Sequence, residues 1–235
     1  MKNLTVTFIQ ARTNSSRLKE KMKLSLGKYQ IIEWVILRLL NTKLSEHLVL
    51  LTTKNKIDDW LVDTANNFGL KTYRGSENNL IERFYLASQK YDVKNVVRVC
   101  ADNPFIDPAE VDKLICFFNK KANLDYAFNH QNRLNNGYAD GFGAEIFTTD
   151  CLSKIYHQKT TKYEKEHVTS FIWNNLEKFK IGTMEAKGPL FNPTLRFDID
   201  TDKDFAQLHK LIDLGVDINS SAENIINTSF LLKND

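Results

Sequence analysis

The sequence predicts one α/β domain in which a mostly parallel sheet is covered by helices on both faces. Up to about residue 120, apolar runs of strand length alternate with segments whose apolar residues recur at helical spacing. The strand-length runs are continuously apolar, which is typical of parallel strands buried on both faces. The chain has 235 residues, of which 42% are hydrophobic, so it can bury the core of one large domain.

The first half of the chain contains four strand signals and four helix signals in alternation. The expected strands cover 4–10, 47–53, 70–73 and 95–100, and the expected helices cover 30–40, 57–68, 80–91 and 108–119. Gly69 stands where a helix C-cap is expected, and Pro108 stands in a first helical turn, where proline is tolerated. This alternation predicts a doubly wound unit.

The second half is less regular. Strands are expected at 125–129, 144–148 and 179–185, and helices at 162–174 and 202–214. Because residues 132–143 are polar and contain glycine, we expect a small protruding arm within 129–165 that serves dimerisation or substrate binding. The polar tail after Asn219 is expected to fray in part.

Composition argues against several classes of function. The net charge of +3 is small for a nucleic-acid-binding protein, so we expect no nucleic-acid partner. The three cysteines form no CxxC pair, which argues against a disulfide framework or a zinc site and fits a reducing cytoplasm. No segment approaches the roughly 20 apolar residues of a membrane span, so we expect a cytoplasmic protein without a membrane partner.

A basic loop follows the first predicted strand. The stretch FIQARTNSSRLKEK, residues 8–21, carries the cations Arg12, Arg17 and Lys21 and the hydroxyls of Ser15 and Ser16. Ligands of open parallel sheets bind beyond the carboxyl ends of the strands, and arginine forks match phosphate oxygens. The loop is neither GxxxxGK[ST] nor GxGxxG. It predicts a phosphate site, and the alternative is a solvated basic turn.

Aspartates follow another predicted strand, in the stretch VCADNPFIDP (99–108). Asp102 at the strand end is a candidate ligand for Mg²⁺, which one or two carboxylates plus substrate phosphates usually hold. Asp107 precedes Pro108 and the next helix, so it is better explained as an N-cap.

A second pair of aspartates lies in RFDIDTDKDF (196–205). If this segment is extended, Asp198 and Asp200 point to the same face and repel each other unless a cation or solvent lies between them. They are candidate metal ligands, and the alternative is an exposed strand edge. Asp202 and Asp204 are better explained by the start of the helix that follows.

Three further segments contain polar candidates. Arg74 and Ser76, in YRGSENNLIERF (73–84), suit a base edge or a sugar, although Ser76 could equally cap the next helix. Asp140 and Glu145, in YADGFGAE (138–145), flank two glycines and could face a substrate. His167, in YEKEHVTSFIW (163–173), could be a substrate residue, or an ordinary surface or core histidine.

Together, the stretches IQARTNSSRLKEK, LLTTKNKIDD, YRGSENNLIERF, RVCADNPFIDP, YADGFGAE, YEKEHVT and RFDIDTDKDF occur in the order seen in one family. The chain resembles the cytidylyltransferases that activate acidic sugars, such as the CMP-sialic acid and CMP-KDO synthetases, and most closely the spore-coat polysaccharide biosynthesis branch. The resemblance covers nearly the whole chain, from about Thr5 to Leu214. The family loop usually has glycine near Asn14 and Pro-Gly before the lysine, where this chain has Lys19-Glu20.

The resemblance implies a Rossmann-like nucleotidyltransferase fold, that of the nucleotide-diphospho-sugar transferases, and transfer of CMP from CTP to an acidic sugar of the nonulosonic or octulosonic type. It also implies Mg²⁺ as cofactor, a homodimer, and a role in surface polysaccharide or glycan biosynthesis. The alternatives are a glycosyltransferase with a related sheet, or a degenerate protein that binds nucleotide without turnover.

The resemblance also assigns roles to residues. It implies that Arg12, Arg17 and Lys21 are catalytic, and that Asp102, Asp198 and Asp200 ligate the metal. Asp140, Glu145 and His167 would bind the acceptor sugar, whose acidic group would need a cation, either Arg133 or Lys162. The nucleotide would be bound by Ala11, Ser15, Ser16, Arg74, Ser76, Ala101 and Asp102.

Overall fold

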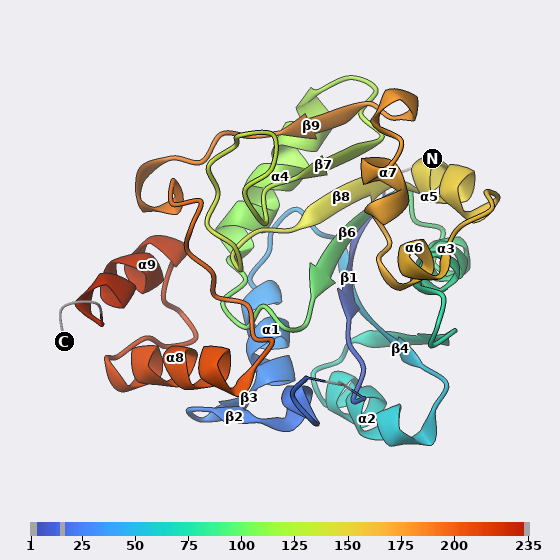
Figure 1. Ribbon diagram of the computed structural model, residues 1–235. Helices are drawn as coiled ribbons and strands as arrows, with labels where there is room; N and C mark the ends of the chain where they lie inside the picture. The colour runs from blue at the N-terminus through green and yellow to red at the C-terminus, as the bar shows by residue number, and fades with distance from the viewer. Residues whose placement is uncertain (1–3, 15–16, 233–235) are drawn as a thin grey trace.

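The computed structural model describes residues 4–14 and 17–232, and its main sheet has seven strands within these ranges (Figure 1). In spatial order they are β5 (Lys71–Gly75), β4 (His47–Thr53), β1 (Thr5–Gln10), β6 (Asn95–Cys100), β8 (Glu145–Thr148), β7 (Tyr126–Phe128) and β9 (Ile181–Thr183). The first four strands are parallel to one another, and β8 pairs antiparallel with both β6 and β7. A short hairpin, β2 (Ser25–Leu26) and β3 (Tyr29–Gln30), follows the basic loop.

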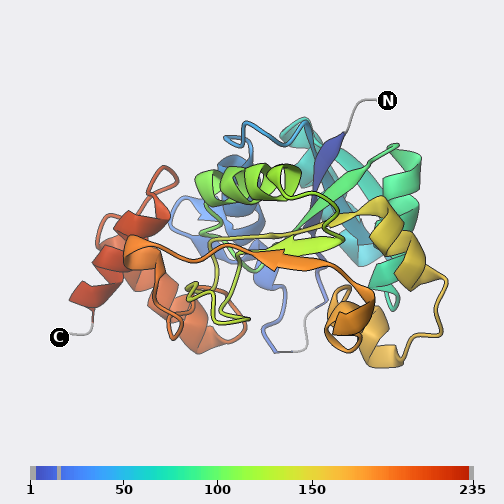
Figure 2. The same cartoon turned by 90° about the horizontal axis from the view of Figure 1, so that it is seen from above.

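Helices cover both faces of the sheet, as the apolar strand runs predict. One hydrophobic core lies between the sheet and α1 (Ile31–Leu39), α2 (Asp59–Asn67), α4 (Pro108–Lys120), α8 (Asp202–Asp213) and α9 (Ala222–Leu231). The other core lies under α3 (Leu80–Lys90), α5 (Thr149–Tyr156) and α7 (Ser170–Trp173), and α6 (Lys162–Glu166) lies next to α3. Figure 2 shows α4 and α7 on opposite sides of the sheet.

Successive residues of β1 show why both faces need a cover. Phe8 packs into the core under α3, whereas Ile9 packs into the core under α1, and neither is exposed. Alternate residues of a strand point to opposite faces, so a continuously apolar strand must be buried on both. The predicted α/β fold class, with a mostly parallel sheet, is confirmed.

Three local expectations are corrected below. Within 129–165, the predicted strand at 144–148 forms β8 inside the sheet and α5 joins a helix layer, so the small arm expected there would be limited to the remaining residues. The expected helix over 162–174 is divided into α6 and α7 at His167. The segment 196–200 forms only a single bridge, between Arg196 and Asp140. The tail forms α9, whose Ile225 and Ile226 are fully buried.

Within the ranges that the structure describes, no helix is both long enough and apolar enough to cross a bilayer.

Asp107 caps α4, as the sequence predicts, and also ties the C-terminal helix to the domain. Its Oδ1 accepts hydrogen bonds from the backbone N–H of Ala109 (2.8 Å) and Glu110 (3.4 Å). Its Oδ2 accepts one from the N–H of Ala222, at 2.7 Å, in the first turn of α9. One side chain therefore satisfies the ends of two helices.

We expect Asp107→Ala to lower the free energy of unfolding by about 2 kcal/mol, because a lost N-cap costs about 1 kcal/mol and a buried N–H is also left unpaired. Asp107→Asn keeps one acceptor oxygen and should lose roughly half as much. Urea denaturation followed by far-UV circular dichroism measures both. Equal stability of Asp107→Ala and the wild type would contradict the double role.

Candidate active site

A cavity of about 280 Å³ opens at the carboxyl ends of β1 and β6, where the sequence places its first anion site. Five cationic side chains line it, against three carboxylates among the described residues. The cations are Arg12, Arg17, Lys21, Arg83 and Arg98, and the carboxylates are Glu77, Asp102 and Glu166. Ala11 and Ala101 also line the cavity, whereas Ser15 and Ser16 lie outside the described residues.

The basic loop is anchored to the body of the protein. The Thr13 N–H donates to Asp58 Oδ1 at 2.7 Å, and the Thr13 hydroxyl accepts from Trp60 Nε1 at 2.7 Å. Further along, Leu18 and Met22 are buried in the core beside α1. These contacts fix both ends of the loop and leave Arg12 and Arg17 exposed at the cavity.

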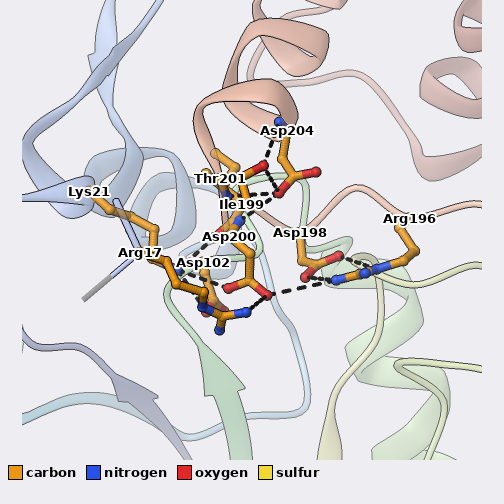
Figure 3. A network of polar contacts seen from close by, with 9 residues as sticks. All are labelled: Arg17, Lys21, Asp102, Arg196, Asp198, Ile199, Asp200, Thr201 and Asp204. Carbon is orange, nitrogen blue, oxygen red and sulfur yellow. Dashed lines mark hydrogen bonds and ion pairs between the residues drawn. The ribbon is translucent and has the colours of Figure 1, made fainter. Parts of the chain in front are cut away.

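Lys21 links the basic loop to both predicted metal segments (Figure 3). Its Nζ lies 3.2 Å from Asp102 Oδ2 and 3.5 Å from Asp200 Oδ1, and it donates to the Ile199 carbonyl at 2.6 Å. Arg17 Nη1 also contacts Asp200, at 2.9 Å from Oδ2. Cations and carboxylates that are far apart in the sequence therefore meet at one point.

Asp102 and Asp200 fit a magnesium site, and Asp198 fits it less well. Both of the first two carboxylates reach Lys21 Nζ, so they converge on one small volume and offer the oxygen ligands that Mg²⁺ prefers. Asp198 is held by Arg196 in a bidentate ion pair, at 3.0 Å and 2.6 Å. In the described part of the chain, no three His, Cys, Asp or Glu residues are grouped as a metal cluster.

The two departures from the family loop do not disturb the cavity. Glu20 adopts a left-handed backbone conformation, with φ 48°, and its carboxylate pairs with Lys23 at 2.5 Å. Glu20 is not among the residues that line the cavity, so its negative charge does not face the predicted phosphate site. Asn14 lines the cavity and is not among the described residues with positive φ.

Arg83 contributes a positive charge to the cavity that the sequence did not predict. It is buried on α3, where its guanidinium donates to the Ser76 carbonyl at 2.9 Å and 2.5 Å. Burial and, to a lesser extent, the neighbouring positive charge of Arg12 together lower the pKa of Arg83 to about 10. Two guanidinium groups that disfavour each other beside one cavity indicate an anion site.

Arg74 and Ser76 lie elsewhere. Arg74 donates to the carbonyls of Thr53 (2.8 Å) and Asn55 (2.7 Å) and pairs with Asp59 (2.6 Å). Neither Arg74 nor Ser76 is among the residues that line the cavity, although Glu77, which follows Ser76, lines it.

A second cavity, of about 330 Å³, adjoins the first. Arg98, Cys100 and His167 line both cavities, and Asp140 and Glu145 line the second. The Glu145 carboxylate is almost fully buried and contacts Arg98, Tyr126 Oη (2.5 Å) and Thr169 Oγ1 (2.9 Å). Glu145, a predicted substrate residue, lines this cavity and pairs with Arg98, and its contact with a substrate stays a prediction.

The titratable groups of the second cavity are shifted in different directions. Burial raises the pKa of Glu145, but Arg98 and the hydrogen bonds outweigh it and bring the pKa to about 2. Burial and the nearby Asp198 raise the pKa of Asp140 to about 7. Burial and the positive charge of Arg98 lower the pKa of His167. The His167 imidazole, which lines both cavities, is therefore mainly neutral at pH 7.

His130, also in this cavity, should make the protein less stable in acid. Burial lowers its pKa from 6.5 to about 4, so the unfolded chain binds a proton more readily between these values. The contribution of the neutral His130 imidazole to the free energy of unfolding is fully present above pH 6.5. It is lost as the pH falls from there through about 4.

We expect His130→Gln to reduce the loss of unfolding free energy between pH 7 and pH 4.5 by about 2 kcal/mol. Denaturant titrations at the two pH values measure this, and His209→Gln, at a half-exposed histidine on α8, is the matched control. An identical pH dependence in both variants would show that His130 is not the responsible group.

Comparison with known proteins identifies the family of this chain. The family described as Cytidylyltransferase matches residues 6–226. An uncharacterized protein of Methanocaldococcus jannaschii is 37% identical over 97% of this chain and 90% of its own length. The spore coat polysaccharide biosynthesis protein SpsF of Bacillus subtilis is 28% identical over 87% of this chain and 84% of its own.

A solved structure has the same fold. The cytidylyltransferase from Leptospira borgpetersenii serovar Hardjo-bovis superposes with a TM-score of 0.87 at 29% identity, covering 98% of this chain and 94% of that one. The resemblance seen in the ordered motifs is thereby confirmed. Because the family match spans most of the chain, the protein belongs to the cytidylyltransferase family.

Proposed function

We propose that this cytidylyltransferase transfers CMP from CTP to an acidic sugar and releases pyrophosphate, for surface polysaccharide or glycan biosynthesis. The observation that carries the proposal is the position of Lys21, which contacts both Asp102 and Asp200 at the edge of a cavity rich in cations. Such a cavity suits a triphosphate, and the carboxylate pair beside it suits the magnesium that accompanies one. The name of the SpsF relative supports the polysaccharide role.

In this proposal, the basic loop holds the phosphates. Arg12 and Arg17 offer exposed guanidinium forks, and Lys21 offers a compact charge on a buried stem. These charges stabilise the negative charge that develops on departing pyrophosphate and cost no reorganisation during the reaction. The adjoining cavity, lined by Asp140 and His167, then holds the acceptor.

The reaction is an in-line displacement at the α-phosphorus. The acceptor hydroxyl oxygen forms a bond to phosphorus, its proton passes to water, and the bond to the bridging oxygen of pyrophosphate breaks. Asp102 and Asp200 would hold Mg²⁺, which supplies Lewis-acid chemistry when bound by lowering the pKa of the acceptor hydroxyl. Until metal binds, the same two carboxylates are neutralised by Lys21 and Arg17.

The observations favour catalysis over a degenerate nucleotide-binding protein. A negative charge from Glu20 beside the phosphates would argue for the degenerate protein. However, Glu20 pairs with Lys23 and does not line the cavity. A glycosyltransferase of related fold would bind a nucleotide diphosphate sugar, which needs fewer cations than the five at this cavity.

Pyrophosphate release from CTP over a panel of acidic sugars, with and without Mg²⁺, tests the proposal. UTP, ATP, and CDP- and UDP-sugars are the comparison nucleotides. We expect release only with CTP, an acidic acceptor and the metal. Tight CTP binding without turnover over the whole panel would favour the degenerate alternative, and turnover of a nucleotide sugar would favour the glycosyltransferase.

A further inference from the structure

We propose that the second cavity recognises the anionic group of the acceptor through Arg133, whose guanidinium is held on the ring of Trp173. The inference rests on the proposed function and adds to it the residues that select the substrate. It follows from the position of the cavity, from polar atoms in its wall that lack partners, and from the ion pairs that its charged groups make.

The position of the cavity suits an acceptor. Arg98, Cys100 and His167 line both this cavity and the one proposed for the nucleotide, so the two spaces share a wall. A group bound in the second cavity can therefore present a hydroxyl to a phosphate bound in the first. The volume of about 330 Å³ is at the small end for ligand sites, which suits a single sugar rather than an oligosaccharide.

Buried polar atoms without partners are concentrated here. Across the residues that the structure describes, four buried side-chain nitrogen or oxygen atoms lack a hydrogen-bond partner. Three of them belong to residues that line this one cavity, namely Asn103 Oδ1, His130 Nδ1 and Trp173 Nε1. Native proteins leave few such atoms, so a cluster of three indicates a polar ligand.

The chemistry of these atoms matches sugar hydroxyls. Trp173 Nε1–H can only donate, and Asn103 Oδ1 can only accept. Because burial lowers the pKa of His130 to about 4, its imidazole is neutral at pH 7 and adds no charge to the set. Hydroxyl groups both donate and accept, so a polyhydroxylated ligand offers a partner of the right kind to each of the three atoms.

The ion pairs of the cavity single out Arg133. Arg98 is paired with Glu145, and Arg196 is paired with Asp198. Arg133 makes no ion pair with any residue in the described ranges, and its guanidinium carbon lies 4.5 Å from the centroid of the Trp173 ring. Stacking on an aromatic face holds a guanidinium in place and leaves its edge N–H donors free for an anion.

Lys162, the other cation considered for the acceptor, is placed differently. Its side chain is 90% exposed, it lies 4.0 Å from Glu166, and it does not line the cavity. The comparison favours Arg133 and also makes Lys162 a matched control, because both are cations on the segment between β7 and α7.

The experiment measures binding by calorimetry, so that it does not depend on turnover. The probes are 3-deoxy-manno-octulosonate and N-acetylneuraminate, each as the free acid and as its uncharged methyl ester, with CTP binding measured in parallel. The proteins are the wild type, Arg133→Ala, Arg133→Lys, Trp173→Phe and Lys162→Ala.

We expect the wild type to bind at least one free acid roughly 10- to 100-fold more tightly than its ester, the range for a charge-assisted bidentate contact. Arg133→Ala should lose this preference and keep the wild-type affinity for CTP and for the ester. Arg133→Lys should keep part of the preference, and Lys162→Ala all of it. Trp173→Phe, which removes Nε1–H, should weaken acid and ester several-fold alike.

Each other outcome overturns the inference. An acid preference that survives in Arg133→Ala assigns the anion to another group, and an equal loss for acid and ester in that variant indicates a structural role only. If neither acid binds to the wild type while CTP does, the ligand class is wrong although the proposed function stands. If CTP does not bind, the proposed function itself fails.

Discussion

Replacing Lys21 by methionine should lower kcat/KM for CTP-dependent pyrophosphate release by roughly 10²- to 10³-fold, the usual cost of removing one preorganised charge from a transition state. Lys21 Nζ contacts Asp102, Asp200 and the Ile199 carbonyl, and the side chain is only 10% exposed. Its charge therefore needs no rearrangement to face a phosphate bound in the adjoining cavity. Methionine matches the length of the apolar stem, so the change removes mainly the charge.

The fold should survive this substitution. The Asp102 and Asp200 side chains are 34% and 19% exposed, so solvent screens part of the repulsion that remains between them. We expect a loss of about 1 kcal/mol in the free energy of unfolding, measured by denaturant titration alongside the kinetics.

Lys23→Met is the matched control. It lies two residues away in the same short helix, and its amine pairs with Glu20 outside the cavity lining. Near-wild-type kinetics are expected for this variant. A similar loss of rate in both variants, or none in Lys21→Met, would remove Lys21 from the proposed mechanism.

The first half of the sheet could be predicted because the signals for its strands and for the helices between them are local in the sequence. Strands such as β1 and β6 are apolar on both faces, and the helices between them show apolar residues at helical spacing. The tail was expected to fray in part because most of its residues are polar, but Ile225 and Ile226 lie in a regular helix, α9. Burial of these residues and the bond from Ala222 to Asp107, 115 positions away, stabilise the helix.

The site was predictable where its residues follow strands. Lys21 and Asp102 follow β1 and β6, so their meeting agrees with the rule that the ends of parallel strands share one edge of a sheet, whereas Asp200 reaches them from a segment that forms only one bridge. Arg83 and Arg98 were missed because they lie within an amphipathic helix and an apolar strand. A charged residue inside an apolar strand, as in VVRVC (96–100), is the signal that could have revealed Arg98.

The sequence could not predict the direction in which the polar side chains of the site point. Arg74 was expected to follow a strand as Arg12 does, yet it lies within β5, and its guanidinium contacts two carbonyls and Asp59. Asp198 and Asp200 were both candidate metal ligands because they alternate in sequence, and the sequence could not decide between them. The segment forms one bridge instead of a ladder, and Arg196 pairs with Asp198 closely, at 2.6 Å, but reaches Asp200 only at 3.8 Å.

That asymmetry leads to the second large effect. We expect Asp200→Asn to lower kcat/KM by roughly 10²- to 10³-fold and Asp198→Asn by less than about 10-fold. The Asp200 carboxylate contacts both Lys21 and Arg17, so it orders the phosphate-binding cations as well as offering a metal ligand. Asp198 has its negative charge neutralised by a bidentate contact with Arg196, and asparagine keeps one of its acceptor oxygens.

The dependence of rate on magnesium separates the two aspartates further. If Asp102 and Asp200 hold the metal, Asp200→Asn should raise the Mg²⁺ concentration needed for half-maximal rate, whereas Asp198→Asn should leave it near the wild-type value. Both variants should unfold within about 1 kcal/mol of the wild type, because partly exposed ion pairs contribute little to stability. A raised magnesium requirement in Asp198→Asn alone would move the metal to the Arg196 side of the site, and then Asp200 would act only by ordering Arg17 and Lys21.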